Sequence, residues 1–294
     1  MARAQTSKKA QKQGQALSLP DMSDLAKVFL DSFLMESLEM ESGVSQEEED
    51  DYYEAFDRLG EVYDQDTEKE AVAKAKEIVA MSPYMVDARL FLIEFDTPDM
   101  ADKIAACEEA VRLGEKFVGP RALREYAGEL WMHIPARPYM RALGELSELY
   151  ADANRMEESF AIAEKILTLN ENDNQGARHI LLPRLIKAQQ WDKAKALHTR
   201  YKKDYTAMWA FLGALVHYKK GKPNKTAERW VLKGHADNPH FAPFLMGKKK
   251  IPAACHEESY CPGEKSEALC FVKDVYEAYA ATDGALGWVS GVLA

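Results

Sequence analysis

The sequence contains little cysteine and no long hydrophobic run, and both absences exclude classes of protein. Its four cysteines are spread over 294 residues, too few for the disulfide framework of a small secreted domain. No apolar run approaches the roughly 18 residues that a membrane-spanning helix needs. Met1–Gln15 is basic and polar without a following apolar segment, unlike a secretory signal. We therefore expect a cytoplasmic protein that makes no membrane contact.

Motifs that carry catalysis are missing as well. The sequence has no G-x-S-x-G, H-E-x-x-H, Walker or G-x-G-x-x-G pattern. Its seven histidines show no i, i+4 pairing of the kind that places two metal ligands on one helix face. We expect no catalytic residues, no cofactor and no enzymatic activity.

Cysteine and histidine come together once, at Cys255, His256, Cys261 and Cys270. A structural zinc site usually contains two cysteines separated by two to four residues, whereas the gaps between the cysteines here are five and eight residues. Cys270 lies in the apolar stretch 268–275, where a cysteine acts as a small hydrophobic residue. We predict no metal site, with zinc binding by Cys255, His256 and Cys261 as the alternative.

Strand signals are nearly absent, because alternating Val, Ile and Thr runs are lacking and only 16 glycines and 12 prolines interrupt the chain. Apolar residues recur instead at three- and four-residue steps, which is typical of helices with one apolar face. Short polar turns separate these segments. The pattern predicts helices over residues 24–40, 52–63, 68–81, 85–95, 100–117, 121–132 and 137–151, and the alternation continues to the C-terminus.

Three pairs of predicted helices share one spacing of large and small residues. In the first helix of each pair, a large apolar residue stands three positions before Leu, Gly or Ser follows Leu directly, and a further apolar residue comes three positions later. In the second helix, two residues that are mostly small stand four positions apart. The three sets are Phe56, Leu59, Gly60, Tyr63, Ala71 and Ala75; Leu143, Leu146, Ser147, Tyr150, Ser159 and Ala163; and Trp209, Leu212, Gly213, Val216, Ala227 and Val231. This spacing resembles the tetratricopeptide repeat. The large apolar residues, Tyr63 among them, are expected to face the paired helix, and the small ones, such as Ser147 and Ser159, to lie where the two helix axes cross closely. Weaker units cover residues 85–117 and the region around Leu181 and Ala194.

The resemblance implies an all-α protein, a right-handed α-α superhelix (a tetratricopeptide-like solenoid) of about five degenerate helix pairs plus extra helices. In such a fold a helix pair buries its apolar face only by stacking on its neighbours. Pro183 falls inside a predicted helix, where we expect a kink. We predict a disordered basic tail at 1–20, an acidic helical repeat block at 21–118, a connecting helix at 119–136 and a C-terminal block with terminal capping helices at 137–294.

The C-terminal half carries a second resemblance. The stretches at 137–142, 169–176 and 237–240 are similar to bacterial tetratricopeptide proteins of unassigned role, and those at 238–245, 263–268 and 284–286 are similar to the helical region of the suppression-of-tumorigenicity-seven family. That family offers no catalytic residues to transfer, and its membrane segments are missing here. The resemblance therefore implies ancestry rather than an activity.

Charge is distributed unevenly along the chain, whose net charge is −10. Residues 21–100 hold 23 acidic and 6 basic residues, whereas residues 1–20 hold 4 basic residues and no acidic one. An acidic front half disfavours nucleic acid as the main ligand, because phosphate binding needs a basic surface. It suits a basic partner or keeps the protein soluble. We interpret the acidic run Glu47–Asp51 as a solvated linker before a helix.

A basic corner lies in the C-terminal half, formed by Lys219, Lys220, Lys222, Lys225 and Lys248–Lys250. Two hypotheses depend on it. The corner could meet the acidic residues 41–57 of a second copy and form a homodimer. Alternatively, the protein is an RNA-associated helical repeat protein that uses the corner and the basic tail, although the aromatic platform of single-strand binders is lacking.

The first helix of each repeat lines the concave groove of a tetratricopeptide superhelix, so its exposed positions are the candidate partner-binding residues. In the C-terminal units these are Arg141, Glu145, Glu148, His179, Lys187, Phe211, His217 and Tyr218. Mixed charge with aromatic anchors suits an extended peptide or a helix, and the alternative is that individual residues pack against neighbouring helices. Asp173 or Asn174 is expected to cap the next helix. We predict a non-catalytic scaffold or adaptor that binds a protein partner in this groove.

Overall fold

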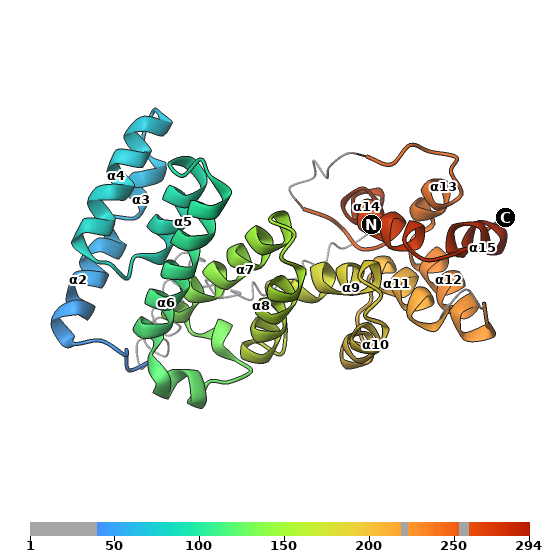
Figure 1. Cartoon of the computed structure of the whole chain (residues 1–294), viewed down its shortest axis with the longest axis horizontal. Coiled ribbons are helices and arrows are strands. Elements are labelled where there is room, and N and C mark those ends of the chain that lie inside the picture. The colour runs from blue at the N-terminus through green and yellow to red at the C-terminus, as the bar shows by residue number, and fades with distance from the viewer. Residues whose placement is uncertain (1–39, 219–222, 253–258) are drawn as a thin grey trace, which may run out of the picture.

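The computed structural model describes residues 40–218, 223–252 and 259–294, and within these ranges the protein is all-helical (Figure 1). The described residues form no strand, and Glu129 and Asn170 make an isolated bridge. None of the described helices has the length and apolar character needed to cross a membrane. The predicted basic tail at 1–20 and the predicted helix at 24–40, except Met40, lie outside the described residues.

The N-terminal elements begin after a short segment that packs on α6. They are α2 (Gln46–Asp57), α3 (Gly60–Tyr63), α4 (Glu68–Met81), α5 (Val86–Phe95), α6 (Met100–Glu125), the 3₁₀ turns η1 (Leu130–Met132) and η2 (Ile134–Ala136), and α7 (Arg137–Asp152).

The C-terminal elements continue the alternation of helix and turn and then add further helices. They are α8 (Met156–Leu169), α9 (Ala177–Lys187), α10 (Trp191–Arg200), α11 (Ala207–Tyr218), α12 (Lys225–Asp237), η3 (Pro239–Phe241), α13 (Ala242–Leu245), α14 (Lys265–Ala280) and α15 (Ala285–Val292). α9 runs through the buried Pro183 as a single helix.

The acidic run before residue 52 is part of a helix and not a linker, which corrects the interpretation of Glu47–Asp51. Ser45 caps α2 by accepting from the backbone N–H of Glu48, and the Glu48 carboxylate accepts from the Ser45 backbone N–H in return. This capping box satisfies N–H groups that the first helical turn leaves free. Carboxylates in the first turn also interact favourably with the helix dipole, so the run supports α2.

The connecting helix predicted at 119–136 is shorter than expected. α6 consists of two helices that meet at a kink at Gly119, whose φ of 77° lies in the left-handed region, and the second of them ends at Glu125. The two 3₁₀ turns follow. The kink is crowded, since the Gly43 N–H donates to the Phe117 carbonyl oxygen at 2.7 Å and a Cβ on Gly43 would lie 2.2 Å from the Lys116 carbonyl oxygen.

Helices that follow one another along the chain pack against one another in space, from α4 through α12. In the second and third copies the two predicted helices form and pack against each other. In the second copy, Ser147 on α7 and Ser159 on α8 approach to 3.2 Å between hydroxyl oxygens, and both are buried. In the third copy, Trp209 on α11 and Ala227 on α12 are fully buried. Small residues therefore lie where these helices cross closely.

The first copy departs from the pattern. The helix expected at 52–63 is interrupted after Asp57 and resumes as the short α3. Phe56 is 40% exposed and Tyr63 is 68% exposed, so these large residues do not face the paired helix. Ala71 and Ala75 on α4 are buried as expected.

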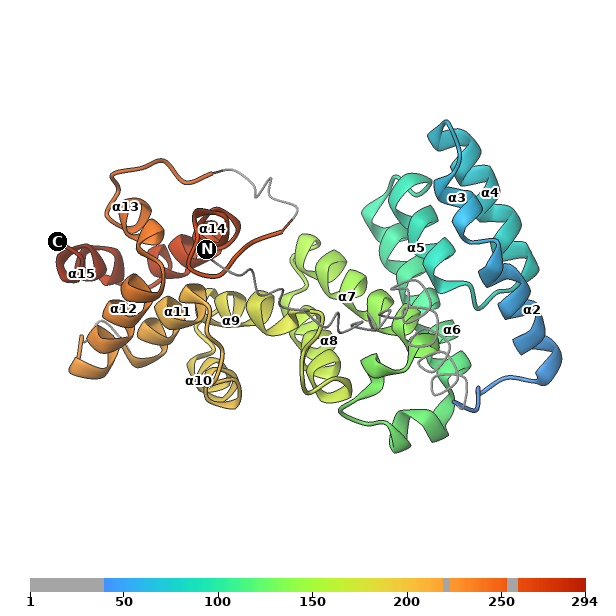
Figure 2. The same cartoon turned by 180° about the vertical axis from the view of Figure 1, so that it is seen from behind.

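α14 breaks the sequential order of packing. It contacts both α9 and α11, and Figures 1 and 2 show it on the side of α9 opposite to α10. Its buried residues Val272, Val275 and Tyr279 belong to the same hydrophobic core as those of α9 and α11. The C-terminal helices therefore cover one face of the α9–α11 region instead of extending the row.

A candidate binding groove

A groove of about 620 Å³ opens between α3, α5 and α7. It is lined by Leu59, Tyr63, Asp87, Leu90, Phe91, Glu94, Phe95, Arg141 and Glu145. α3, α5 and α7 lie at the positions where the repeat pattern places the first helix of each pair. The groove includes two of the predicted partner-binding residues, Arg141 and Glu145.

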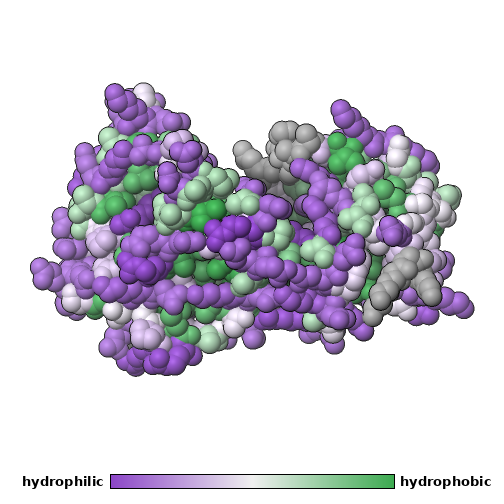
Figure 3. All heavy atoms as spheres, in the orientation of Figure 1, coloured by the Kyte–Doolittle hydropathy of each residue, from purple (hydrophilic) through white to green (hydrophobic). Residues whose placement is uncertain are grey.

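One wall of the groove is aromatic. The ring centroids of Phe91 and Phe95 are 4.6 Å apart on α5, and Tyr63 meets Phe91 edge-on at 6.1 Å. Tyr63 and Phe95 are exposed large hydrophobic residues. Figure 3 shows hydrophobic side chains at the surface of the half of the molecule formed by α2 to α7, set among hydrophilic ones. This exposed aromatic wall was not predicted from the sequence, where Tyr63 was assigned to packing between helices.

The other wall is charged and only partly neutralised. Arg141 on α7 makes a bidentate ion pair with Asp87 on α5, with N–O distances of 2.8 and 2.6 Å. Glu94 and Glu145 have no ion pair among the described residues. Burial raises the pKa of Glu145 above its ordinary value, and the nearby Glu94 and Glu148 carboxylates raise it further. Two carboxylates of the groove thus have no ion-pair partner among the described residues.

Two further predicted residues, Glu148 and Lys187, form interhelical ion pairs. Glu148 on α7 pairs with Arg184 on α9 at 2.6 Å. Lys187 on α9 pairs with Glu277 on α14 at 2.6 Å. These pairs link α7 to α9 and α9 to α14, so the two predicted residues contribute to the contacts between helices.

Phe211 and Tyr218 are not exposed, which corrects the sequence-based expectation. Phe211 is fully buried, packs against Phe241 at 5.3 Å, and its backbone carbonyl accepts from Tyr279 on α14. Tyr218 is 3% exposed and donates to the Asp283 carbonyl oxygen at 3.2 Å. α14 and the segment after it occupy the face where the groove was expected. His217 is half-buried, with its ring 6.4 Å from that of His198.

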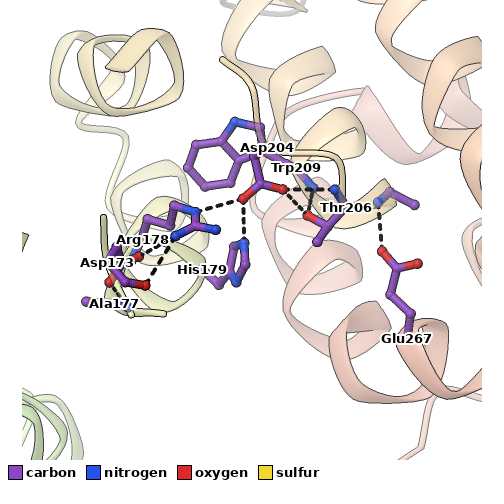
Figure 4. Close-up of polar contacts among 9 residues, drawn as sticks. Asp173, Ala177, Arg178, His179, Asp204, Thr206, Trp209 and Glu267 are labelled. Carbon is purple, nitrogen blue, oxygen red and sulfur yellow. Dashed lines mark hydrogen bonds and ion pairs between the residues drawn. The ribbon is translucent and has the colours of Figure 1, made fainter. Parts of the chain in front are cut away.

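His179 belongs to a closed polar cluster at the start of α9 and α11 (Figure 4). Its Nε2 lies 2.7 Å from Asp204 Oδ2, which also accepts from Arg178 Nε at 2.7 Å. Asp204 Oδ1 accepts from the Thr206 N–H and hydroxyl. Burial by itself would raise the pKa of Asp204, but the hydrogen bonds from His179 and Thr206 outweigh burial and hold that pKa far below its ordinary value.

Asp173 and Glu267 complete this corner by capping helices. Asp173 accepts from the backbone N–H groups of Ala177 and Arg178 at 2.8 and 2.9 Å, which confirms the capping role predicted for it. Glu267 on α14 is fully buried and accepts from the Ala207 N–H of α11 at 2.7 Å. The carboxylates of this cluster are thus satisfied by neighbouring groups, and its role is to hold α9, α11 and α14 in place.

No group of three or more His, Cys, Asp and Glu side chains suited to a metal ion occurs among the described residues. Cys255 and His256 lie outside them. Cys261 is an exposed free thiol and Cys107 a buried one. Cys270 lies in a helix, α14, as predicted, and is disulfide-bonded.

No protein-family model matches the chain, and no curated protein matches it. The likeness to tetratricopeptide repeats therefore depends on the residue spacing and on the helix packing described above.

Proposed function

We propose that the protein is a non-catalytic scaffold or adaptor, built as a right-handed tetratricopeptide-like superhelix, that binds a protein partner in the groove of α3, α5 and α7. The observation that carries the proposal is the aromatic wall, since Tyr63 is 68% and Phe95 is 42% exposed beside a groove of about 620 Å³. The proposal involves no cofactor and no catalytic residue.

Exposed aromatic side chains that line a groove are suited to act as binding anchors. Covering apolar surface contributes about 25 cal/mol per Å², so each ring that a partner covers contributes on the order of 1–3 kcal/mol. Binding energy in protein interfaces is concentrated in a few such residues. Tyr63, Phe91 and Phe95 are therefore the residues expected to dominate the affinity, with Arg141 and the carboxylates of the groove supplying specificity.

The test is to compare partners that co-purify with the tagged wild-type protein and with a Tyr63→Ala/Phe95→Ala variant, identified by mass spectrometry. Both side chains are exposed, so the fold should persist, which circular dichroism checks. Phe56→Ala is the matched control, because Phe56 is also exposed, at 40%, but does not line the groove. A partner retained by wild type and control but lost by the groove variant supports the proposal. A set of partners that is unchanged in the groove variant contradicts it.

An RNA-associated function remains the second candidate, supported by the exposed run Lys248–Lys250 that follows α13. Lys219, Lys220 and Lys222 lie outside the described residues. Fluorescence anisotropy with single-stranded RNA at several salt concentrations tests this candidate, because phosphate contacts make affinity fall with salt. Changing Lys248–Lys250 to Gln should weaken RNA binding and reduce its salt dependence, and an unchanged affinity would argue against this function.

A further inference from the structure

Within the protein, one helix, α14, already lies across α9 and α11, each of which is the first helix of a repeat pair. α14 packs on α9 and α11, and it buries Val272, Val275 and Tyr279 in the shared core. The ring of Phe271 on α14 meets His179 of α9 at 5.7 Å. The element that covers α9 and α11 is thus an amphipathic helix of 16 residues.

The charges across that contact are complementary. α9 contributes Lys187, which pairs with Glu277 on α14 at 2.6 Å. Asp274 of α14 also lies where Lys187 and Arg184 act on its charge. The side chains of α9 that act on these two residues are therefore basic, and α14 presents carboxylates to them.

The open groove of α3, α5 and α7 has the opposite charge. Arg141, the cation among the described residues that line it, is held in a bidentate pair by Asp87. Glu94 and Glu145 remain without an ion pair among the described residues, and their charges repel each other. Lys103 attracts Glu145 from outside the lining of the groove but makes no ion pair with it. An occupant that removes water from both carboxylates without supplying a cation would leave buried charge unpaired, which is strongly destabilising.

We infer that this groove accepts an amphipathic helix of a protein partner whose apolar face is flanked by Lys or Arg side chains. The inference rests on the proposed function and specifies its ligand. The apolar face would cover Tyr63, Phe91 and Phe95, and the basic side chains would pair with Glu94 and Glu145. A cation placed beside these rings also gains a cation–π attraction. A helix with the charge pattern of α14 would instead bring carboxylates against carboxylates.

Two fluorescent 16-residue peptides test the inference on the full-length protein. The first has the sequence of α14, Lys265–Ala280, with Cys270→Ser, and the second carries Asp274→Lys and Glu277→Lys in addition. We expect the basic peptide to bind at least about tenfold more tightly than the acidic one, since tenfold corresponds to about 1.4 kcal/mol. In a Glu94→Gln/Glu145→Gln protein this preference should fall to about twofold or less.

The control protein is Glu47→Gln/Glu228→Gln, which removes the same charge at exposed positions that do not line the groove. It should keep the preference for the basic peptide, and Tyr63→Ala/Phe95→Ala should weaken the binding of that peptide. Equal binding of the two peptides, or tighter binding of the acidic one, overturns the inference, while the co-purification test of the proposed function is unaffected. Failure of both peptides to bind also overturns the inference that the groove accepts a helix. Loss of the co-purified partner in the aromatic variant would then show that the scaffold function stands with a different ligand.

Discussion

The phenolic hydroxyl of Tyr279 on α14 donates a hydrogen bond of 2.9 Å to the backbone carbonyl oxygen of Phe211 on α11. Both residues are fully buried. The contact spans 68 residues of sequence, and with the Glu267 cap on Ala207 it fixes α14 across the face of α11. Because α14 covers α9 and α11, the groove of α3, α5 and α7 is the part of the first helices that we propose binds a partner.

Replacing Tyr279 with Phe should lower the free energy of unfolding by about 1 kcal/mol, because one buried hydrogen bond is lost while the ring remains. Tyr279→Ala should lower it by about 3 kcal/mol or more, since a cavity is left in the core. Chemical denaturation followed by circular dichroism measures both. Tyr205→Phe, at a tyrosine that is 70% exposed, is the control and should change little. Equal stability of Tyr279→Phe and the wild type would mean that the hydrogen bond contributes nothing.

Gly213→Ala should destabilise the protein by about 1–3 kcal/mol, because it overfills a packed core. A Cβ at residue 213 would lie 2.3 Å from Nε2 of His198, whose ring is stacked on Trp209 and edge-on to Trp230. The ring therefore has little room to move away. Thermal or chemical denaturation measures the loss.

The matched control for that substitution is Gly287→Ala on α15, where a Cβ meets nothing within 4 Å. Alanine favours the helix there, so stability should rise by about 0.5–1 kcal/mol. Adding His198→Ala to Gly213→Ala should remove the clash and give a double mutant more stable than the two single losses predict. Additive losses would show that the contact with His198 is not the cause.

The stability of the protein should fall as the pH drops from about 6.5 to 4, with His198 contributing. Burial, and to a smaller extent the charge of His217, lowers the pKa of His198 to about 4. Over this pH range the unfolded chain therefore binds a proton at His198, whereas the folded protein does not. As a result, the free energy of unfolding falls by about 3 kcal/mol across the range. Above pH 6.5 the contribution is fully present. Denaturation at several pH values should show a smaller slope for His198→Gln, and parallel curves would contradict the assignment.

Arg141→Met should lower the free energy of unfolding by about 1 kcal/mol, a modest figure because the arginine side chain is 43% exposed and screened by solvent. The loss arises because the carboxylate of Asp87, 14% exposed, is left unpaired. The double variant Arg141→Met/Asp87→Asn should recover part of that stability. If Asp87→Asn gives no recovery in the Arg141→Met background, the ion pair is not what Arg141 contributes.

The uneven charge of the chain leads to a prediction about self-association. If Lys248–Lys250 of one copy contact the acidic residues 41–57 of another, the protein should form dimers at low ionic strength that dissociate as salt screens the charges. Within residues 41–57, Glu41 and Glu48 already form ion pairs with Arg121 and Lys116. Light scattering between low and high salt measures the mass, and a monomer at every salt concentration would exclude this dimer.

Local patterns in the sequence predicted much of the fold. Helix periodicity gave α4 with the same bounds as the structure and α5 to within one residue. The capping role of Asp173 was predictable because capping depends on residues within one turn. The crossing of Ser147 and Ser159 was predictable because paired helices are joined by a short turn. These features need only neighbouring residues, so a single sequence contains them.

The composition of the groove could be predicted only in part. Arg141 and Glu145 were identified because their helix position places them on the open side of α7. The exposure predicted for Phe211 and Tyr218 was wrong because α14 and the residues after it cover α11. Tyr63 was assigned to packing because the break between α2 and α3 was not predicted. Contacts between residues far apart in sequence caused the errors at Phe211 and Tyr218, and no local pattern reports such contacts.

The sequence by itself determined that the chain forms amphipathic helices joined by short turns, with small residues where consecutive helices cross. Periodicity and capping are interactions within a few residues, so they require no knowledge of the rest of the chain. The tertiary structure alone decided that α14 closes the α9–α11 face while the α3, α5 and α7 groove stays open. The reason is that the free energy of packing α14 depends on apolar and charged surfaces brought together from distant segments, such as Lys187 with Glu277.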